Sequence, residues 1–336
     1  MASDKKPIVA FLGPTASYTH QAVRQVFSDD AWHFKPVITI DDVFDEVQNR
    51  GAIVGVVPFE NSTNGSVVFT LDDLADRNGQ YADIKVNGEI FVDVHHYLLG
   101  HKDTSGAAPA AGSATPGTST PTAADPTPSQ PKSKPLESLE HVKRVYSHPQ
   151  AFGQCNKFLS TYLKGAERFE VSSTSKAAEV VSQDPSGASA AISSQLAGEL
   201  CGLDALAESI EDRDDNTTRF LIIGIEDRLP AEYPVKHKPE DKSGTKSLVS
   251  FTVPHRAPGA LAAVLGCFEQ FQLDLTSINS RPSLLQPFQY IIFVEFEGSK
   301  LDDPDNRVAG ALDKIGSVAQ SWRWFGSWET YKKSTS

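Results

Sequence analysis

The sequence predicts an α/β protein with two lobes and a smaller separate domain at its C-terminal end. Three observations support this prediction. The chain has 336 residues, which is more than a typical single domain. Short apolar runs alternate with amphipathic segments between about residues 7 and 226, as in parallel sheets with crossover helices. Residues 246–330 follow a different order of elements, so we predict that they form a domain of their own.

The first lobe is predicted from residues 7–99, where strand-like runs are followed by helical patterns. The expected elements are a strand at residues 8–12, a helix at 17–27, a helix at 41–47 and a strand at 53–57. Val43, Phe44 and Val47 have the spacing that places apolar side chains on one face of the second helix. This alternation predicts a parallel sheet with crossover helices.

A compositional break follows the first lobe. Residues from about 104 to 135 are almost all Ala, Pro, Ser, Thr and Gly, and none is a large apolar residue. Such a stretch cannot bury enough surface to offset the entropy lost on ordering it. Because the strand–helix alternation resumes afterwards, we predict a disordered insertion and not a boundary between domains.

The second lobe is predicted from the alternation after this insertion. Its expected elements are strands at 142–146, 169–171 and 188–192, and helices at 149–162, 175–181 and 193–201. A last strand at 219–225 is expected to return to the first lobe, which ends the two-lobed region near residue 226. The polar residues 227–245 are a predicted linker.

The C-terminal segment, residues 246–330, has the pattern of a ferredoxin-like domain. Ser247–Val253 alternates as a strand does, and an apolar stripe from Leu261 to Phe271 has helical spacing. Further strands are expected at 273–280, 290–296 and 319–325, with a second helix at 301–315. The resulting βαββαβ order is the ferredoxin-like arrangement.

The composition narrows the classes of function. A net charge of −12 without a long basic run argues against nucleic acid as a partner. Cys155, Cys201 and Cys267 are far apart, and neither they nor the histidines have metal-binding spacing. No apolar run is long enough to span a bilayer, and the N-terminal residues have no leader pattern. We therefore expect a cytoplasmic protein that needs no metal and no cofactor.

The most informative stretch is Asn216–Ile222, where polar residues lead into an apolar run with the pattern of a buried strand. Open α/β sheets bind their ligands at the mouths of such strands. Arg219 suits the binding of a carboxylate, which makes it a candidate ligand-binding residue. The alternative is an ion pair between Arg219 and an acidic residue just upstream. The acidic residues there are Glu211, Asp212, Asp214 and Asp215.

A second polar stretch follows the predicted strand at 142–146. Ser147 and Gln150 have the spacing of a capping box, and Pro149 suits the first turn of a helix. The helix then presents free N–H groups beside Ser147 and His148, which can serve an anion or be an ordinary cap. Gln154 lies one helical turn further on and offers both a donor and an acceptor.

Other polar residues that are candidates for a site can also be explained by a purely structural role. Glu60 follows the predicted strand at 53–57, but an isolated carboxylate in such a loop is usually only exposed, and the nearby Asn-Gly pair is a turn signal. Residues 13–19 form a strand-to-helix loop without the glycine pattern that binds dinucleotides. His95 and His96 are expected within a strand, in a structural role.

Together these stretches resemble the prephenate dehydratase family. The matching motifs are Phe11-Leu12-Gly13-Pro14 with Ser17-Tyr18-Thr19-His20, Val57-Pro58-Phe59-Glu60-Asn61-Ser62 with Gly65, Ser147-His148-Pro149-Gln150-Ala151 with Gln154-Cys155, and Asn216 with Thr218-Arg219-Phe220. The likeness covers nearly the whole chain apart from the insertion. It implies a catalytic domain at residues 7–226 with a two-lobed, periplasmic-binding-protein-like fold.

The resemblance also implies an activity and the residues that perform it. The implied enzyme is a carbon–oxygen lyase that converts prephenate to phenylpyruvate in L-phenylalanine biosynthesis. The predicted catalytic residues are Thr218, at the leaving hydroxyl, and Glu60, which with water is a candidate proton source. The predicted substrate-binding residues are Thr19, Asn61, Ser62, Ser147, His148, Gln154 and Arg219.

The C-terminal segment resembles the ACT domain that commonly follows in this family. Its Pro258-Gly259-Ala260-Leu261 and Ser280-Arg281-Pro282 match two characteristic regions, although Asn279 replaces the usual glutamate. The resemblance implies inhibition by L-phenylalanine bound where two such domains meet, in a homodimer or homotetramer. The predicted effector-binding residues are Gly259, Ala260, Leu261, Asn279, Ser280, Arg281 and Pro282.

Two alternatives remain open from the sequence. Arogenate dehydratase differs only in an amino group on the side chain of its substrate, and the sequence discriminates poorly between the two. A non-catalytic amino-acid sensor is also compatible with a two-lobed α/β fold. The presence of Thr218 between the other polar stretches disfavours the sensor, since pure binding needs no proton donor.

Overall fold

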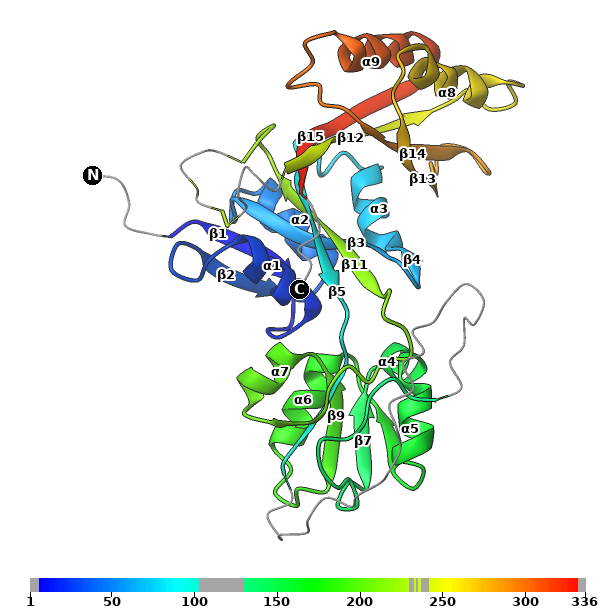
Figure 1. Cartoon of the computed structure of the whole chain (residues 1–336). Coiled ribbons are helices and arrows are strands. Elements are labelled where there is room, and N and C mark those ends of the chain that lie inside the picture. Colours follow the sequence, from blue (N-terminus) through cyan, green and yellow to red (C-terminus); the bar gives the residue numbers. More distant parts are fainter. Residues whose placement is uncertain (1–5, 103–129, 230–232, 234, 237–241, 332–336) are drawn as a thin grey trace. The chain divides into compact units, whose positions relative to one another are not determined.

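The computed structural model describes residues 6–102, 130–229, 233, 235–236 and 242–331. The described residues form two compact units, and Figure 1 labels most of their elements. Unit 1 takes its residues from 1–12, 22–91 and 219–336, and unit 2 from 13–21 and 92–218. The chain therefore passes into unit 1 for the last time between Thr218 and Arg219. This confirms that the strand predicted at 219–225 returns to the first lobe.

The first sheet of unit 1 has the strand order β2-β1-β3-β11-β5, with the short β4 paired to β3. Strand β1 pairs in parallel with β2 and β3, whereas β4 pairs antiparallel with β3. The strands are β1 (Ile8–Leu12), β2 (His33–Val37), β3 (Val54–Asn61), β4 (Gly65–Ser66), β5 (Lys85–Asp93) and β11 (Thr217–Gly224). The helices between them are α1 (Tyr18–Val26), α2 (Ile40–Gln48) and α3 (Val68–Ala75).

Helix α2 shows how the local sequence specifies an element of this unit. Thr39 caps the helix by accepting a hydrogen bond from the backbone N–H of Asp42, and the Asp42 carboxylate accepts one from the N–H of Thr39. Val43, Phe44 and Val47 are fully buried, so the apolar face predicted from their spacing is confirmed.

Unit 2 has a second sheet with the order β10-β6-β9-β7-β8. The prediction of parallel sheets is wrong in part: β7 pairs in parallel with β8 and β9, but β6 pairs antiparallel with β9 and β10. The strands are β6 (Tyr97–Gly100), β7 (Arg144–Ser147), β8 (Glu167–Glu170), β9 (Ser189–Ser193) and β10 (Asp204–Ala207). The helices are α4 (Pro149–Gln154), α5 (Asn156–Tyr162), α6 (Thr174–Ser182) and α7 (Gln195–Cys201).

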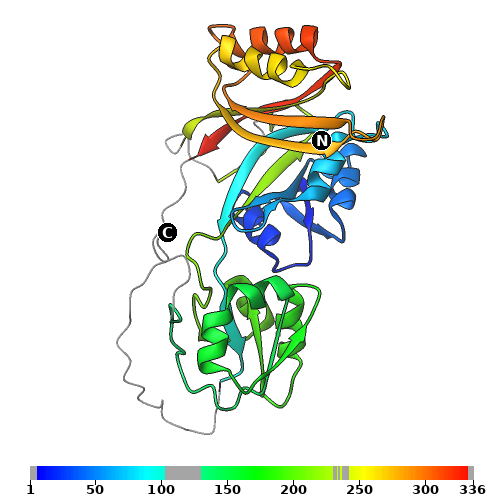
Figure 2. The ribbon, with the colours of Figure 1, turned by 90° about the vertical axis from the view of Figure 1, so that its right-hand side faces the viewer.

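The predicted ferredoxin-like domain is confirmed by its elements and their pairing. They are β12 (Lys242–Thr252), α8 (Ala260–Gln270), β13 (Leu275–Pro282), β14 (Tyr290–Glu297), α9 (Arg307–Val318) and β15 (Ser321–Tyr331). The antiparallel sheet has the order β13-β14-β12-β15. Helices α8 and α9 cover one face of it, as both Figure 1 and Figure 2 show.

The other face of this sheet packs against the first sheet of unit 1. Leu248, Phe293 and Phe325 belong to the same hydrophobic cluster as Leu221 of β11. Gly326 makes the close approach possible, because a Cβ at this position would lie 2.4 Å from the backbone oxygen of Val86 on β5. The ferredoxin-like domain is therefore part of unit 1 and not an independent module.

The predicted insertion and linker fall partly outside the described residues. Residues 104–129 of the insertion are not described, but its last residues depart from the predicted disorder. Pro135 forms a β-bridge with Ala207, and Lys132 pairs with Glu211 and Asp214. Within the linker predicted at 227–245, β12 already begins at Lys242.

Candidate active site

In unit 1, three predicted site residues lie at the end of β3 and in the turn that follows. Glu60 pairs with Ser66 across the β3–β4 hairpin, and 41% of its side chain is exposed. The Asn61 side-chain oxygen accepts hydrogen bonds from the backbone N–H groups of Thr63 and Asn64, at 3.0 and 2.9 Å. Asn61 therefore holds the turn together, whereas Ser62 is exposed at its start.

Arg219 is the centre of a buried charge cluster in the same unit. Its side chain is only 8% exposed, and its Nη2 lies 2.7 Å from a carboxylate oxygen of Glu89 on β5. The same nitrogen contacts Glu295 of β14, and Nη1 lies 3.9 Å from Glu60. Burial would lower the pKa of the Arg219 guanidinium, but Glu295 and Glu89 outweigh this effect and raise it.

The alternative that Arg219 pairs with the acidic residues just upstream is wrong, because those residues have other partners. Glu211 and Asp214 pair with Lys132, and Asp215 pairs with Arg213. Asp212 accepts a hydrogen bond from the backbone N–H of Lys157, at the start of α5. Arg219 instead keeps its Nη atoms on three distant carboxylates, while its Nε has no hydrogen-bond partner among the described residues.

In unit 2, the predicted cap of the helix at 149 is assigned to the wrong residue. His148, not Ser147, is the N-cap of α4, and its Nδ1 accepts a hydrogen bond from the backbone N–H of Gln150. The Ser147 side chain is fully buried and donates its hydroxyl to the carbonyl oxygen of Ile192 on β9. This hydrogen bond connects β7 to β9 within unit 2, and the role of Ser147 toward a substrate stays a prediction.

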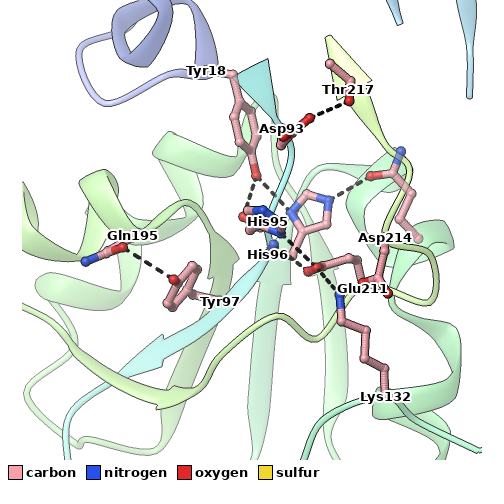
Figure 3. Close-up of polar contacts among 11 residues, drawn as sticks. Tyr18, Asp93, His95, His96, Tyr97, Lys132, Gln195, Glu211, Asp214 and Thr217 are labelled. Atoms are coloured by element: carbon pink, nitrogen blue, oxygen red, sulfur yellow. Dashed lines mark hydrogen bonds and ion pairs between the residues drawn. The ribbon is translucent and has the colours of Figure 1, made fainter. Parts of the chain in front are cut away.

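Gln154 contacts His96, which belongs to the polar network drawn in Figure 3. Its Oε1 lies 2.7 Å from His96 Nε2, while the Tyr18 hydroxyl lies 3.1 Å from His96 Nδ1. Burial lowers the pKa of His96, so the imidazole is neutral at pH 7. The sequence predicts His95 and His96 within a strand, and this is wrong. They lie between β5 and β6. His96 thus fixes the amide of a predicted substrate-binding residue.

A buried carboxylate, Glu211, anchors this network (Figure 3). It is 1% exposed and accepts hydrogen bonds from the backbone N–H of His96 at 2.8 Å and from Lys132 at 2.8 Å. His95 Nδ1 lies 3.1 Å from it. Burial would raise the pKa of Glu211, but the hydrogen bonds from His95 and Lys132 outweigh burial and lower it to about 2.

Replacing Glu211 by glutamine is expected to destabilise unit 2 in a pH-dependent way. The pKa of Glu211 lies below its ordinary value of 4.5 in the folded chain, so its contribution is present above pH 4.5 and lost as the pH falls toward 2. The shift corresponds to about 3 kcal/mol. Urea unfolding at pH 6 should show a loss of about 2–3 kcal/mol in the variant, and curves that converge toward pH 3.

The matched control is the exposed Glu208 in the same unit, replaced by glutamine. This variant should follow the wild-type curve, since an exposed carboxylate contributes little. A constant difference between wild type and Glu211→Gln at all pH values would contradict the assigned ionisation.

Asn216 and Thr218 lie just before the point at which the chain passes from unit 2 into unit 1. Thr218 is half-buried near the start of β11, and its neighbour Thr217 donates a hydrogen bond of 2.5 Å to Asp93 (Figure 3). Asn216 is buried, and its carbonyl oxygen accepts a hydrogen bond from Val94. Thr19 on α1 is also buried.

The predicted effector-binding residues lie in two places on the ferredoxin-like domain. Gly259 caps α8 with a φ of +80°, Ala260 begins this helix, and Leu261 lines a cavity of about 600 Å³. The residues of β13 instead contact the part of unit 1 that contains α3. Arg281 donates two hydrogen bonds to Asp72, each 2.8 Å long.

Two further contacts connect β13 to the same part of unit 1. Ser66 donates a hydrogen bond of 2.5 Å to the side-chain oxygen of Asn279, and Arg77 donates one to the carbonyl oxygen of Pro282. Ser280, between them, is exposed. The residue that departs from the family pattern, Asn279, is thus connected to β4, which follows the turn at Asn61.

Sequence reasoning missed three residues of the Arg219 cluster: Glu89, Lys246 and Glu295. Glu89 and Glu295 are buried in strands that are otherwise largely apolar. A charged residue inside such a run is rarely buried without a partner. This rule could have indicated from the sequence that Glu89 and Glu295 are paired. Among the described residues, no group of three or more His, Cys, Asp or Glu side chains is placed to hold a metal ion. No described helix is long and apolar enough to cross a membrane.

The fold and these residues define a two-lobed α/β protein with a C-terminal ferredoxin-like domain. A family model for prephenate dehydratase matches residues 9–228. The bifunctional chorismate mutase/prephenate dehydratase of Aquifex aeolicus is 33% identical over 328 residues, which cover 98% of this chain and 75% of that protein. The prephenate dehydratase of Methanocaldococcus jannaschii is 32% identical over 294 residues, covering 87% of this chain and 89% of that one.

A comparison with solved structures also finds a prephenate dehydratase. Prephenate dehydratase from Arthrobacter aurescens, in complex with L-Phe, matches with a TM-score of 0.73 and 25% identity, over 96% of this chain and 90% of that one. The chain belongs to the prephenate dehydratase family.

Proposed function

We propose that this protein is a prephenate dehydratase that converts prephenate to phenylpyruvate, carbon dioxide and water. The observation that carries this proposal is the family match over residues 9–228, which includes Thr218-Arg219-Phe220 at the start of β11. The arrangement of polar residues around these positions supports it. Glu60 lies near Arg219 in unit 1, and His96 orients Gln154 in unit 2.

The reaction itself defines what the protein must supply. Loss of a carboxyl group as carbon dioxide and of the ring hydroxyl creates an aromatic ring, so the product provides much of the driving force. The hydroxyl leaves as water only if it gains a proton, and charge develops on its oxygen before the proton arrives. The protein must therefore hold two carboxylates, orient the ring and stabilise the leaving oxygen.

Each candidate residue receives one task in this scheme. Thr218 is assigned a positioned hydrogen bond to the leaving oxygen, because a neutral hydroxyl is too weak an acid to be the ultimate proton source. The proposed proton source is Glu60, whose side chain is partly exposed, or a water molecule near it. Arg219 is assigned to a carboxylate of the substrate. The remaining proposed binding or orienting residues are Asn61, Ser62, Ser147, His148, Gln154 and Thr19.

A substrate comparison tests this proposal against its alternatives. Purified protein is incubated with prephenate or with arogenate at neutral pH, and phenylpyruvate or phenylalanine is quantified over time. The proposal predicts that kcat/KM for prephenate is at least tenfold higher than for arogenate. The reverse preference identifies an arogenate dehydratase, and binding of either compound without turnover identifies a sensor.

We further propose that L-phenylalanine inhibits the enzyme through the ferredoxin-like domain. The Arthrobacter aurescens relative was solved in complex with L-Phe. In this chain, Leu261 lines a cavity that is suited to an apolar side chain, together with Phe288, Tyr290 and Ile292. Titration of L-phenylalanine should lower the rate in a saturable manner, whereas D-phenylalanine should have little effect. An unchanged rate at millimolar L-phenylalanine contradicts the regulatory proposal but leaves the activity in place.

We also propose that the protein is a homodimer or homotetramer and that it acts in the cytoplasm. Ile278, Leu284, Leu285 and Phe288 are exposed apolar residues on the ferredoxin-like domain, which supports burial against a second copy. The three cysteines are not in disulfide bonds, which fits a reducing compartment. Light scattering of the purified protein measures the oligomeric state, and a monomer would contradict this part.

A further inference from the structure

The Tyr18 hydroxyl and the Gln154 side chain contact opposite nitrogens of the His96 ring within unit 2. The hydroxyl lies 3.1 Å from His96 Nδ1 and 3.0 Å from the carbonyl oxygen of His95, and Figure 3 shows both contacts. Gln154 Oε1 lies 2.7 Å from His96 Nε2. His96 is 2% exposed, and its ring meets the Tyr18 ring edge to face at an angle of 80°. Both ring nitrogens are therefore engaged inside a packed environment.

The protons available to these contacts are few. Burial raises the pKa of Tyr18 well above its ordinary value, so the hydroxyl keeps its one proton at neutral pH. Burial lowers the pKa of His96, so the neutral ring has one N–H and one bare nitrogen. Because each contact needs one donor and one acceptor, the position of the ring proton and the direction of the Gln154 amide are coupled.

The direction of the amide assigns these protons. The carbonyl oxygen of the Gln154 side chain faces Nε2, so the ring proton is on Nε2 and is donated to this oxygen. Nδ1 is then the bare nitrogen. The Tyr18 hydroxyl shares its proton between Nδ1 and the His95 carbonyl oxygen, which lie at nearly equal distances from it. The NH2 end of the amide is consequently turned away from His96.

The reverse arrangement is compatible with the same packing. In it, Tyr18 donates to the His95 carbonyl alone, Nδ1–H donates to the Tyr18 oxygen, and Nε2 accepts from the amide NH2. Both ring nitrogens would still be satisfied, and the carbonyl would gain an undivided hydrogen bond, so packing alone does not favour the arrangement in the structure. The two differ in the end of the amide that is turned away from His96. An anionic substrate needs the NH2 donor at that end, because a carbonyl oxygen would repel it.

We propose that Tyr18 is a positioning residue that adapts Gln154 to a carboxylate of the substrate. Its proton on Nδ1 holds His96 in the Nε2–H tautomer. This tautomer keeps the amide oxygen of Gln154 on the ring and leaves the NH2 group for the substrate. Tyr18 acts through these two residues and needs no contact with the substrate. This role rests on the proposed dehydratase activity, whose substrate, prephenate, has two carboxylates.

Replacing Tyr18 by phenylalanine tests this role, with Tyr97→Phe as the matched control. Both changes keep the ring and remove a hydroxyl, and the hydroxyl of Tyr97 lies 3.3 Å from Gln195 Oε1 in the same unit. In Tyr18→Phe, KM for prephenate should rise about tenfold, as expected when a hydrogen bond to a charged group is lost. Because the bond serves binding, kcat should change less than about twofold. Tyr97→Phe should match wild type in both constants.

Nitrogen-15 NMR of the full-length chain with labelled histidine reads the tautomer without substrate. In wild type and Tyr97→Phe, the His96 proton should be on Nε2, whereas Tyr18→Phe should show a mixture with the Nδ1–H form. A wild-type ring that is protonated on Nδ1 overturns the role of Tyr18. A Tyr18→Phe variant that keeps either the wild-type tautomer or the wild-type KM overturns it too.

A second variant covers the case in which Tyr18→Phe does not fold. Gln154→Glu can still accept the Nε2–H of His96 but has no donor for the substrate, so its KM should rise at least about tenfold, and an unchanged KM contradicts the role. The two readouts also separate this role from the proposed function. Turnover of prephenate by a wild type with the Nδ1–H tautomer overturns the role alone. No turnover by a wild type with the Nε2–H tautomer overturns the proposed function, and the role toward substrate with it.

Discussion

Replacing Thr218 by valine is expected to lower kcat for prephenate at least 100-fold while KM changes only a few-fold. Valine keeps the β-branched shape at this half-buried position and removes only the hydroxyl. A preorganised donor acts on the charge that develops in the transition state, and loss of one such donor typically costs a factor of about 100 to 1,000 in rate. Steady-state kinetics with prephenate measure both constants.

The serine variant separates the hydroxyl from the shape of the side chain. Thr218→Ser keeps the donor and should retain at least a tenth of the wild-type kcat. A valine variant with near-normal turnover would remove Thr218 from the mechanism. An equal loss in the serine and valine variants would indicate that the methyl group, and therefore packing, is what matters.

Replacing Arg219 by methionine is expected to cost about 3 kcal/mol in the free energy of unfolding. The change leaves Glu89 and Glu295 buried without their shared cation, and breaking a buried ion pair from one side typically costs about 3–5 kcal/mol. Lys246, 3.4 Å from Glu89 and 3.2 Å from Glu295, keeps the loss at the lower end of this range. Urea unfolding at pH 7 measures it.

The pH dependence of this loss follows from Glu295. Because Arg219 holds the pKa of Glu295 below its ordinary value in the folded chain, the pair stabilises the protein above pH 4.5 and ceases to do so as the pH falls further. The wild-type and Arg219→Met curves should therefore approach each other as the pH falls below 4.5.

An exposed ion pair provides the matched control for Arg219→Met. Arg213 and Asp215 are also paired, but their side chains are 45% and 64% exposed. Arg213→Met should leave the free energy of unfolding close to that of the wild type, because an exposed ion pair contributes little. Equal losses in the two arginine variants would contradict the buried cluster as the source of the effect.

Elements with local signals were predicted from the sequence, and those set by distant contacts were not. Helix α2 has its capping residue and apolar face within ten residues, and the sequence predicts it closely. The helix predicted at 149–162 is instead divided at Cys155. The cause is remote: Asp212 accepts a hydrogen bond from the N–H of Lys157 and so caps α5 from another part of the chain.

The candidate site shows the same limit. Thr218 and Arg219 stood out because polar residues precede a buried strand, and the chain crosses between units at this point. The partners of Arg219 could not be read from spacing, since Glu89 and Glu295 come from strands far away in sequence. The acidic residues near Arg219 in sequence are instead bound by Lys132, by Arg213 and by the N-terminus of α5.

The most direct test of the central claim is the stoichiometry of products formed from prephenate by the wild-type protein. Carbon dioxide release and phenylpyruvate formation are measured together at neutral pH, where Glu211 and Glu295 are ionised, against a control without protein. The account predicts rapid, equimolar formation of both products, and a loss of both in Thr218→Val. Prephenate that is bound but recovered unchanged would contradict it.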